Sequence, residues 1–282
     1  MNDYRFTPRG FAMLCAALFA LLLGAPEAKA AECTVELSAD DHAQLVALSD
    51  TADLEEIEDV RDRVAAIAEI FASNDDPRGL FPVVYAPITA RAVQSVEDGA
   101  YADEIWASAI IVEFARPYLD ALNLHLTGGN PAPEWQHYYE RATDCDGSWL
   151  RAAATGINTH LTVDLARTVA LVDTPASYQD DFDLYGEILV EVEPQITENL
   201  WNDYGVDAED FFGGFFFGDF VDGTHGDGTL TTFVFQVVRG NAWRNGQLLR
   251  NFWTRGWGNH GIATTRAKFE LALGSLEALG AI

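Results

Sequence analysis

The chain has 282 residues, of which 49% are hydrophobic and 22% are charged, and this composition excludes a disordered protein. It carries 17 Lys and Arg against 44 Asp and Glu, which gives a formal net charge of −27. Affinity for nucleic acids and anionic membranes comes mostly from Lys and Arg, so the charge also excludes non-specific binding to such polyanions. The acidity fits both a saline habitat and a GC-rich genome.

The first 30 residues have the parts of a secretory signal peptide. Arg5 and Arg9 precede an apolar run over residues 11–23, and residues 28–30 (Ala-Lys-Ala) fit the cleavage rule. The run is shorter than the roughly 20 apolar residues that span a bilayer. We therefore expect a cleaved signal peptide over residues 1–30, with an uncleaved membrane anchor as the alternative.

Cleavage would leave a mature chain, residues 31–282, that is periplasmic or secreted and has no stable membrane insertion. Its two cysteines, Cys33 and Cys145, would lie in a compartment where disulfides persist. A bridge between them would close a loop of roughly 100 residues, worth about 4 to 5 kcal/mol in the chain-entropy model. The alternative, a metal thiolate pair, is disfavoured by Asp144 and Asp146 beside Cys145.

Apolar residues recur at three- and four-residue steps through most of the chain, which predicts helices. The expected helices cover residues 54–71, 82–99, 103–127, 135–142, 148–172, 178–204, 229–253 and 263–279. Pro117 should kink or interrupt the third of these, and Pro194 is a possible break in the sixth. Residues 205–228, rich in Gly, Phe and acids, predict an ordered loop. Without repeats or linkers, the pattern predicts one all-α domain, a multi-helix bundle with one glycine- and phenylalanine-rich loop.

The main candidate site lies in residues 156–165, Gly-Ile-Asn-Thr-His-Leu-Thr-Val-Asp-Leu. On a helix, His160 and Asp164 project from one face and could bind Zn²⁺ or another divalent metal. Their neighbours are apolar, and a buried charged pair requires partners. Asn158, two residues earlier, is a third candidate. The alternative is a surface His paired with its own i+4 carboxylate.

Candidate partners for this pair lie on the preceding helix. Glu113, Arg116 and Asp120 fall on one helical face, and Glu113 has apolar neighbours. They are expected either in the site or as an internal ion pair that locks two helices. His125, near the end of the same helix, favours a cationic role at the helix C-terminus.

Arg239 presents a cation four residues before Trp243. It could bind the carboxylate of Glu113 or Glu187 within the chain, or an anionic group of a substrate.

Two other sequence patterns bear on function. Asp219, Asp222, His225 and Asp227 could wrap Ca²⁺, but the EF-hand order of ligands is missing, which favours a solvated loop. The sequence also lacks a Gly-x-Ser-x-Gly elbow, a Walker loop, a dinucleotide fingerprint and a His-Glu-x2-His motif. Serine-hydrolase, nucleotide and flavin functions therefore lose support.

The chain resembles a helical bacterial family catalogued as a domain of unknown function. The resemblance covers about residues 75–255, and its most specific element is the Gly-x-Asn-x-His-x3-Asp-Leu string. It is carried by residues 77–81 (Pro-Arg-Gly-Leu-Phe), 84–85 (Val-Tyr), 114–122 (Phe-Ala-Arg-Pro-Tyr-Leu-Asp-Ala-Leu), 156–165 and 239–248. It implies a helical fold and directs attention to Asn158, His160 and Asp164.

A weaker similarity, of spacing alone, links the His-x3-Asp pair to zinc-dependent phospholipases C and related single-strand nucleases. Those enzymes also use a mature N-terminal Trp and several more His, whereas this mature chain would begin with Ala31.

These patterns favour an exported helical enzyme, a hydrolase or lyase, that acts on a small or apolar substrate. Its catalytic candidates are His160, Asp164, Asn158, Glu113, Arg116, Asp120 and Arg239. A metal on His160 and Asp164 would lower the pKa of a bound water. Without a metal, the pair resembles a general base with its orienting acid. The alternative is a non-catalytic binding or structural protein of the cell envelope with a buried His/Asp/Arg network.

Overall fold

The computed structural model describes residue 33, residues 35–212 and residues 233–282. The expected signal peptide lies outside these ranges, as do Asp219, Asp222, His225 and Asp227 of the expected glycine-rich loop.

Every regular element within the described residues is a helix, which confirms the expected all-α class. The α-helices are α2 (Ala39–Leu48), α3 (Ile57–Ser73), α4 (Leu80–Glu97), α5 (Glu104–Leu126), α6 (Pro133–Ala142), α7 (Trp149–Thr159), α8 (Leu165–Leu171), α9 (Gln179–Val190), α10 (Glu193–Tyr204), α12 (Phe233–Leu249) and α13 (Arg255–Ala278). Single turns are η1 (Pro77–Gly79), η2 (His160–Asp164) and η3 (Ala176–Tyr178). The sequence pattern did not predict α2. The helix expected over residues 178–204 is divided into α9 and α10 next to Pro194, where a break was considered possible.

Side chains of small polar residues fix where several helices begin. Ser38, Asp103 and Ser148 each accept a hydrogen bond from a backbone N–H in the first turn of α2, α5 and α7, respectively. Each bond satisfies a donor that has no partner inside its own helix. Gly205 ends α10 in the left-handed conformation, with φ 64°, which costs glycine little.

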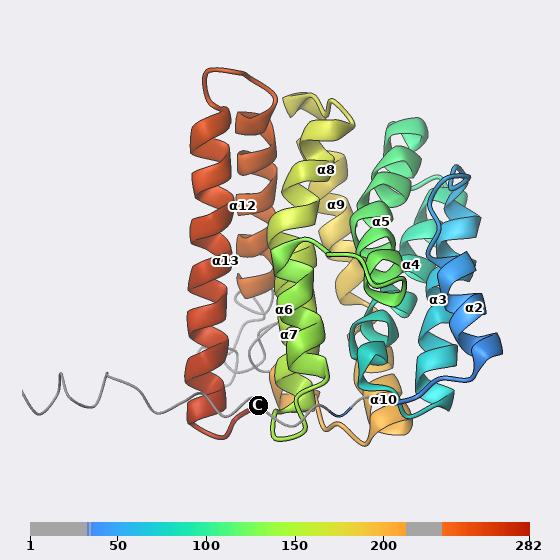
Figure 1. Ribbon diagram of the computed structural model, residues 1–282. Helices are drawn as coiled ribbons and strands as arrows, with labels where there is room; N and C mark the ends of the chain where they lie inside the picture. The colour runs from blue at the N-terminus through green and yellow to red at the C-terminus, as the bar shows by residue number, and fades with distance from the viewer. Residues whose placement is uncertain (1–32, 34, 213–232) are drawn as a thin grey trace, which may run out of the picture. The chain divides into compact units, whose positions relative to one another are not determined.

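The helices pack side by side around a continuous apolar core. Helix α3 lies along α4, α6 lies along α7, and α12 contacts both α13 and α8 (Figure 1). Among the largest fully buried side chains are Trp135, Tyr118 and Tyr138, which come from α5 and α6. The centre of the core is therefore aromatic. No helix in the described ranges is both long and apolar enough to span a bilayer.

Helix α5 continues through Pro117, where a kink or an interruption was expected, so the helix is not interrupted there. Proline has no N–H, so the carbonyl of Glu113, four residues earlier, loses its usual partner. The hydroxyl of Thr168 on α8 donates to that carbonyl over 3.3 Å. Pro117 therefore does not end α5. It frees the carbonyl of Glu113, which accepts a hydrogen bond from α8 instead.

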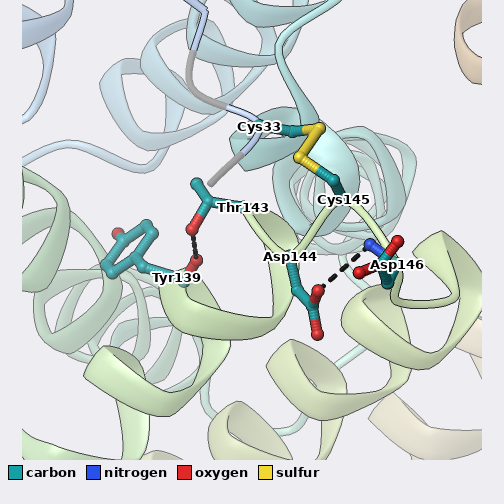
Figure 2. The surroundings of a disulfide bond; sticks show 6 residues. All are labelled: Cys33, Tyr139, Thr143, Asp144, Cys145 and Asp146. Atoms are coloured by element: carbon teal, nitrogen blue, oxygen red, sulfur yellow. Dashed lines mark hydrogen bonds between the residues drawn. A yellow bond between two sulfur atoms is a disulfide. The ribbon is translucent and has the colours of Figure 1, made fainter. Parts of the chain in front are cut away.

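A disulfide joins Cys33 to Cys145, as the sequence predicted, across 112 positions of the chain (Figure 2). The backbone N–H of Cys33 also donates to the carbonyl of Thr143, over 2.7 Å. The segment before α2 is therefore attached, covalently and by a hydrogen bond, to the connection between α6 and α7.

We expect the Cys33→Ser/Cys145→Ser double variant to lose about 2 to 4 kcal/mol in free energy of unfolding, because the disulfide restricts the unfolded chain. Urea unfolding of the mature protein measures this loss. The oxidised wild type should lose a similar amount in reductant, while the double variant should not respond. Equal midpoints for the wild type with and without reductant would contradict the prediction.

Candidate functional site

His160 and Asp164 lie at the two ends of η2, a single π-helical turn between α7 and α8. Both side chains are buried, with residue exposures of 3% and 2%. Isolated π turns inside helices are uncommon and occur frequently at functional sites. The sequence predicted the shared face of the pair but not the π turn.

The pair is connected by a hydrogen bond and held by a third side chain. Nδ1 of His160 lies 3.1 Å from Oδ2 of Asp164. The indole Nε1 of Trp135, from α6, donates to the same carboxylate oxygen over 3.0 Å. The Asp164 carboxylate thus fixes the orientation of both the imidazole of His160 and the indole of Trp135.

Four aromatic rings surround the imidazole of His160 and form what we call the aromatic enclosure: Phe81, Tyr85, Phe114 and Trp135. Phe114 stacks on the imidazole with ring centres 3.7 Å apart. Tyr85 and Phe81 meet it edge-on at 4.6 and 5.3 Å, and Trp135 lies at 6.0 Å. The rings come from α4, α5 and α6, so three helices contribute to one site.

Burial sets the protonation of the pair. It lowers the pKa of His160, although the hydrogen bond to Asp164 acts in the opposite direction, and it raises the pKa of the Asp164 carboxyl. The imidazole is therefore neutral at neutral pH. With Asp164 ionised, Oδ2 accepts from both Trp135 and Nδ1, so Nδ1 carries the imidazole proton. Nε2 is then a buried lone pair, and it has no hydrogen-bond partner in the described part of the chain.

The remaining residues of the Gly-x-Asn-x-His string position α7 against its neighbours. A Cβ at Gly156 would lie 2.9 Å from Phe81, so only glycine allows this approach of α7 to α4. The amide nitrogen of Asn158 donates to Glu270, over 2.8 Å, and to the carbonyl of Arg266, over 3.2 Å. Asn158 therefore binds α13, and no hydrogen bond joins it to His160.

Glu270 is the centre of a polar cluster that the sequence analysis missed. Arg151, 2% exposed, forms an ion pair with it, and His137 lies 3.7 Å away. Burial raises the pKa of Glu270, but hydrogen bonds from His137, Arg151 and Asn158 outweigh that effect and lower the pKa to about 2. Glu270 lies 112 residues from Asn158, so the local spacing of residues in the sequence could not link the two.

Glu113, Arg116 and Asp120 do form a group, but away from His160. Arg116 bonds Glu113 over 3.1 Å and donates to the carbonyls of Thr51 and Leu54. Asp120 accepts from the hydroxyl of Thr51 over 2.6 Å. Glu113 is thus paired with Arg116 on the same helix, and hydrogen bonds attach the group to the connection between α2 and α3; the ion pair itself does not join two helices.

Arg239, on α12, is buried at 4% exposure. It donates to the carbonyl of Phe182, and its guanidinium carbon lies 4.3 Å from the centre of the Phe182 ring. Among the described residues it forms no ion pair with either expected partner, Glu113 or Glu187.

An apolar cavity of about 40 Å³ separates Arg239 from the aromatic enclosure. Tyr85 and Phe114 belong to both the enclosure and the cavity wall. The cavity is lined by Tyr85, Ile88, Thr89, Ala92, Ile110, Ile111, Phe114, Leu165, Phe182, Tyr185, Leu189 and Arg239. Of the seven candidates from the sequence, the structure thus brings His160 and Asp164 together and places Arg239 across the cavity.

A metal site needs more ligands than the described residues bring together. Within the described ranges no group of three or more His, Cys, Asp and Glu side chains could hold a metal ion. Oδ2 of Asp164 already accepts two hydrogen bonds, whereas Nε2 of His160 has no hydrogen-bond partner in the described part of the chain and could ligate a metal. Metal ligation by His160 and Asp164 stays a prediction.

The aromatic enclosure was not assigned a role from the sequence. A signal for it was present, because the strings that carry the family resemblance include Phe81, Tyr85 and Phe114. Trp135 lies outside those strings and could not be linked to Asp164, 29 residues away, by spacing.

His125 is not cationic, although its position near the C-terminal end of α5 favoured a cation. Its ring stacks on Tyr139 with centres 4.0 Å apart, and burial lowers its pKa to about 4. The ring is therefore neutral at neutral pH, and desolvation outweighs the attraction of the helix dipole.

Comparison with known proteins confirms the family expected from the sequence. The model described as "Family of unknown function (DUF5995)" matches residues 57–271. The match includes the His160–Asp164 pair, the aromatic enclosure and Arg239. No curated protein and no solved structure matched the chain.

We expect the free energy of unfolding to fall as the pH drops from about 6.5 towards 4, because the unfolded chain then protonates His125 while the folded chain does not. His125→Phe keeps the stacked ring and should remove roughly 1 kcal/mol of this loss, after allowance for partial exposure. Urea unfolding at several pH values measures it. His260→Phe, on an exposed position of α13, is the matched control and should follow the wild type. The same pH slope in His125→Phe would contradict the assignment.

Proposed function

The chain belongs to this family of unknown function, and we propose that it is an exported helical enzyme in which His160 is a general base on a small or apolar substrate. The observation that carries the proposal is the state of the imidazole. Nδ1 is held by Asp164, while Nε2 is buried with no partner among the described residues. An acceptor that stays unpaired inside a core has a free-energy cost, and a catalytic role accounts for it.

The reaction that suits this base is hydrolysis by water. Nε2 of His160 takes a proton from the water as its oxygen attacks a carbonyl carbon, and the imidazolium then returns that proton to the leaving group. Asp164 stabilises the imidazolium that forms in between, a role like that of the acid in Ser-His-Asp sites. The buried aromatic enclosure strengthens this electrostatic support, because the interaction acts in surroundings less polar than water.

A metal-assisted version uses the same nitrogen. Nε2 of His160 would hold the ion, and the metal would lower the pKa of a bound water to near neutrality. Such an ion would need further ligands besides His160.

Export is supported by the disulfide and by the composition of residues 1–30. The Cys33–Cys145 bridge suits an oxidising compartment, since cytosolic thiols are kept reduced. Together with the signal-type pattern, it supports a periplasmic or secreted enzyme.

A second candidate function is a non-catalytic binding or structural protein of the cell envelope. Full burial of the pair favours it, as does the packing of Phe114 and Trp135 on the imidazole. In that function the pair orients α7 and α8 and performs no chemistry.

We expect the mature protein to hydrolyse p-nitrophenyl esters of short acids, and His160→Gln to lower kcat/KM by about 100-fold or more, the usual contribution of a general base. Asp164→Asn keeps an oxygen for Trp135 but loses the carboxylate that selects the tautomer, so a comparable loss is expected. Release of p-nitrophenol measures both. His260→Gln is the surface control. Wild-type turnover by His160→Gln would contradict the base assignment. No turnover by any protein, with a large fall in melting temperature for Asp164→Asn, would favour the second candidate.

Metal analysis separates the two versions of the enzyme. If the base acts alone, the wild type purified without chelators should hold far less than one equivalent of zinc, manganese, iron or cobalt, and chelators should not change turnover. One equivalent in the wild type that is lost in His160→Ala would instead establish the metal-assisted version.

A further inference from the structure

The hairpin of α12 and α13 is the one place in this acidic chain where a long stretch of sequence carries no acid. Residues 233–269 contain neither Asp nor Glu, whereas the whole chain has 44 of them against 17 Lys and Arg. The same stretch contains six cationic residues: Arg239, Arg244, Arg250, Arg255, Arg266 and Lys268. Positive charge is therefore concentrated on this hairpin, which favours a local site for an anion.

A cavity of about 540 Å³ lies between these two helices, which pack side by side (Figure 1). Its polar lining includes Arg244, Asn245, Thr264, Thr265 and Lys268. Arg244 and Lys268 are exposed, and no Asp or Glu is among the described residues that line the cavity. Sites for small molecules have volumes of about 300 to 1,000 Å³, so this cavity has the size of a ligand site.

The acids on neighbouring segments face other parts of the structure. Glu270, the first acid after the acid-free stretch, forms an ion pair with Arg151 of α7. Asp183 and Glu187 of α9 line a separate depression, together with Gln236. An anion in the cavity would therefore contact Arg244 and Lys268 and no described carboxylate.

Asn245 is an independent indication of a ligand. The residue is 6% exposed and lines the cavity, yet its side-chain amide forms no hydrogen bond within the described part of the chain. Gly261 of α13 makes room for it, because a Cβ there would lie 2.1 Å from Oδ1 of Asn245. Buried amides normally have hydrogen-bond partners, since an unpaired one destabilises the fold. The NH₂ group of Asn245 is thus available to donate to an anion.

The donors in this cavity suit a phosphate better than a carboxylate. Arg244 offers a planar fork and Lys268 a compact charge, and both kinds of cation bind phosphate. The hydroxyls of Thr264 and Thr265 and the amide of Asn245 add neutral donors. A phosphate monoester has three terminal oxygens and up to two negative charges, whereas a carboxylate has two oxygens and one charge.

The remaining walls of the cavity are apolar. They are formed by Val237, Val238, Phe269 and Ala272. The volume of about 540 Å³ is many times the roughly 30 Å³ that one water occupies in the liquid, so a phosphate group alone would leave most of it unfilled. An apolar group attached to the phosphate would fill the remainder against these side chains.

We propose that the cavity between α12 and α13 binds a phosphate monoester that carries an apolar group. Arg244, Lys268 and Asn245 hold the phosphate, and the valines of α12 contact the apolar group. None of the residues that line this cavity belongs to the aromatic enclosure or to the His160–Asp164 pair. The proposal therefore goes beyond the proposed function and does not depend on hydrolysis at His160.

Calorimetric titration of the mature protein with hexyl phosphate tests the proposal. Hexanol, which lacks the phosphate, and inorganic phosphate, which lacks the chain, are the matched probes. We expect hexyl phosphate to bind with a Kd of about 1 mM or lower, and each matched probe to bind at least tenfold more weakly. Arg244→Met should weaken hexyl phosphate at least tenfold. Arg255→Met, an exposed arginine of the same hairpin that does not line the cavity, should bind as the wild type does.

Lys268→Gln is a second variant, which removes one exposed charge and leaves Arg244 in place. It should also weaken hexyl phosphate while its circular dichroism stays helical. Equal binding of hexyl phosphate and either matched probe would overturn the proposal. So would unchanged binding in Arg244→Met or Lys268→Gln, or no binding of hexyl phosphate up to about 10 mM, well above the expected Kd.

A sedimentation assay distinguishes a soluble ester from a lipid headgroup of the same chemistry. The probe is vesicles of phosphatidylcholine with phosphatidic acid, whose headgroup is a phosphate monoester. We expect no co-sedimentation, because the net charge of −27 repels an anionic bilayer. Co-sedimentation that Arg244→Met abolishes would instead assign the site to the lipid headgroup.

Discussion

The burial of the His160–Asp164 pair is the constraint that organises the centre of this protein. An imidazole and a carboxylate removed from water are stable only if each finds polar or polarisable neighbours. Asp164 obtains them from His160 and from the indole of Trp135. The imidazole obtains them from Asp164 and from the face of Phe114. Because these partners come from different helices, satisfying the pair fixes the positions of α5, α6 and the α7–α8 segment together.

The Gly-x-Asn-x-His-x3-Asp string has a structural meaning for each of its polar or small positions. Gly156 allows α7 to approach Phe81 on α4, and Asn158 binds Glu270 on α13. His160 and Asp164 then lie at the two ends of a π turn that comes directly after α7. One short string therefore sets the contacts of α7 with three parts of the bundle, which explains why it carried the resemblance to the family.

Most helices could be predicted because their apolar faces repeat with the helical period, and that period is a local property of the sequence. The composition of the site could be predicted only in part. Glu113 and Phe114 are adjacent, yet neighbouring helical residues point about 100° apart, and only packing decides which of them faces His160. Glu113, Arg116 and Asp120 lie on one face of α5, as their spacing predicted, but that face contacts the connection between α2 and α3. Pro117 does not end α5, and the hydroxyl that bonds the freed carbonyl of Glu113 belongs to Thr168 of a distant helix. Local sequence spacing could not indicate that contact.

The charge of the chain makes the surroundings of Arg239 informative. The chain has 44 Asp and Glu residues, any of which could in principle supply a carboxylate to pair with a buried arginine. Two of them, Asp183 and Glu187, lie on the helix that contacts Arg239, and both are exposed. Phe182 and Gly186 of that helix lie against the guanidinium, and the charge of Asp183 raises the pKa of Arg239 against the larger effect of burial. The net charge of −27 therefore describes the solvent-facing surface, while Arg239 is a cation buried in the core near the aromatic enclosure.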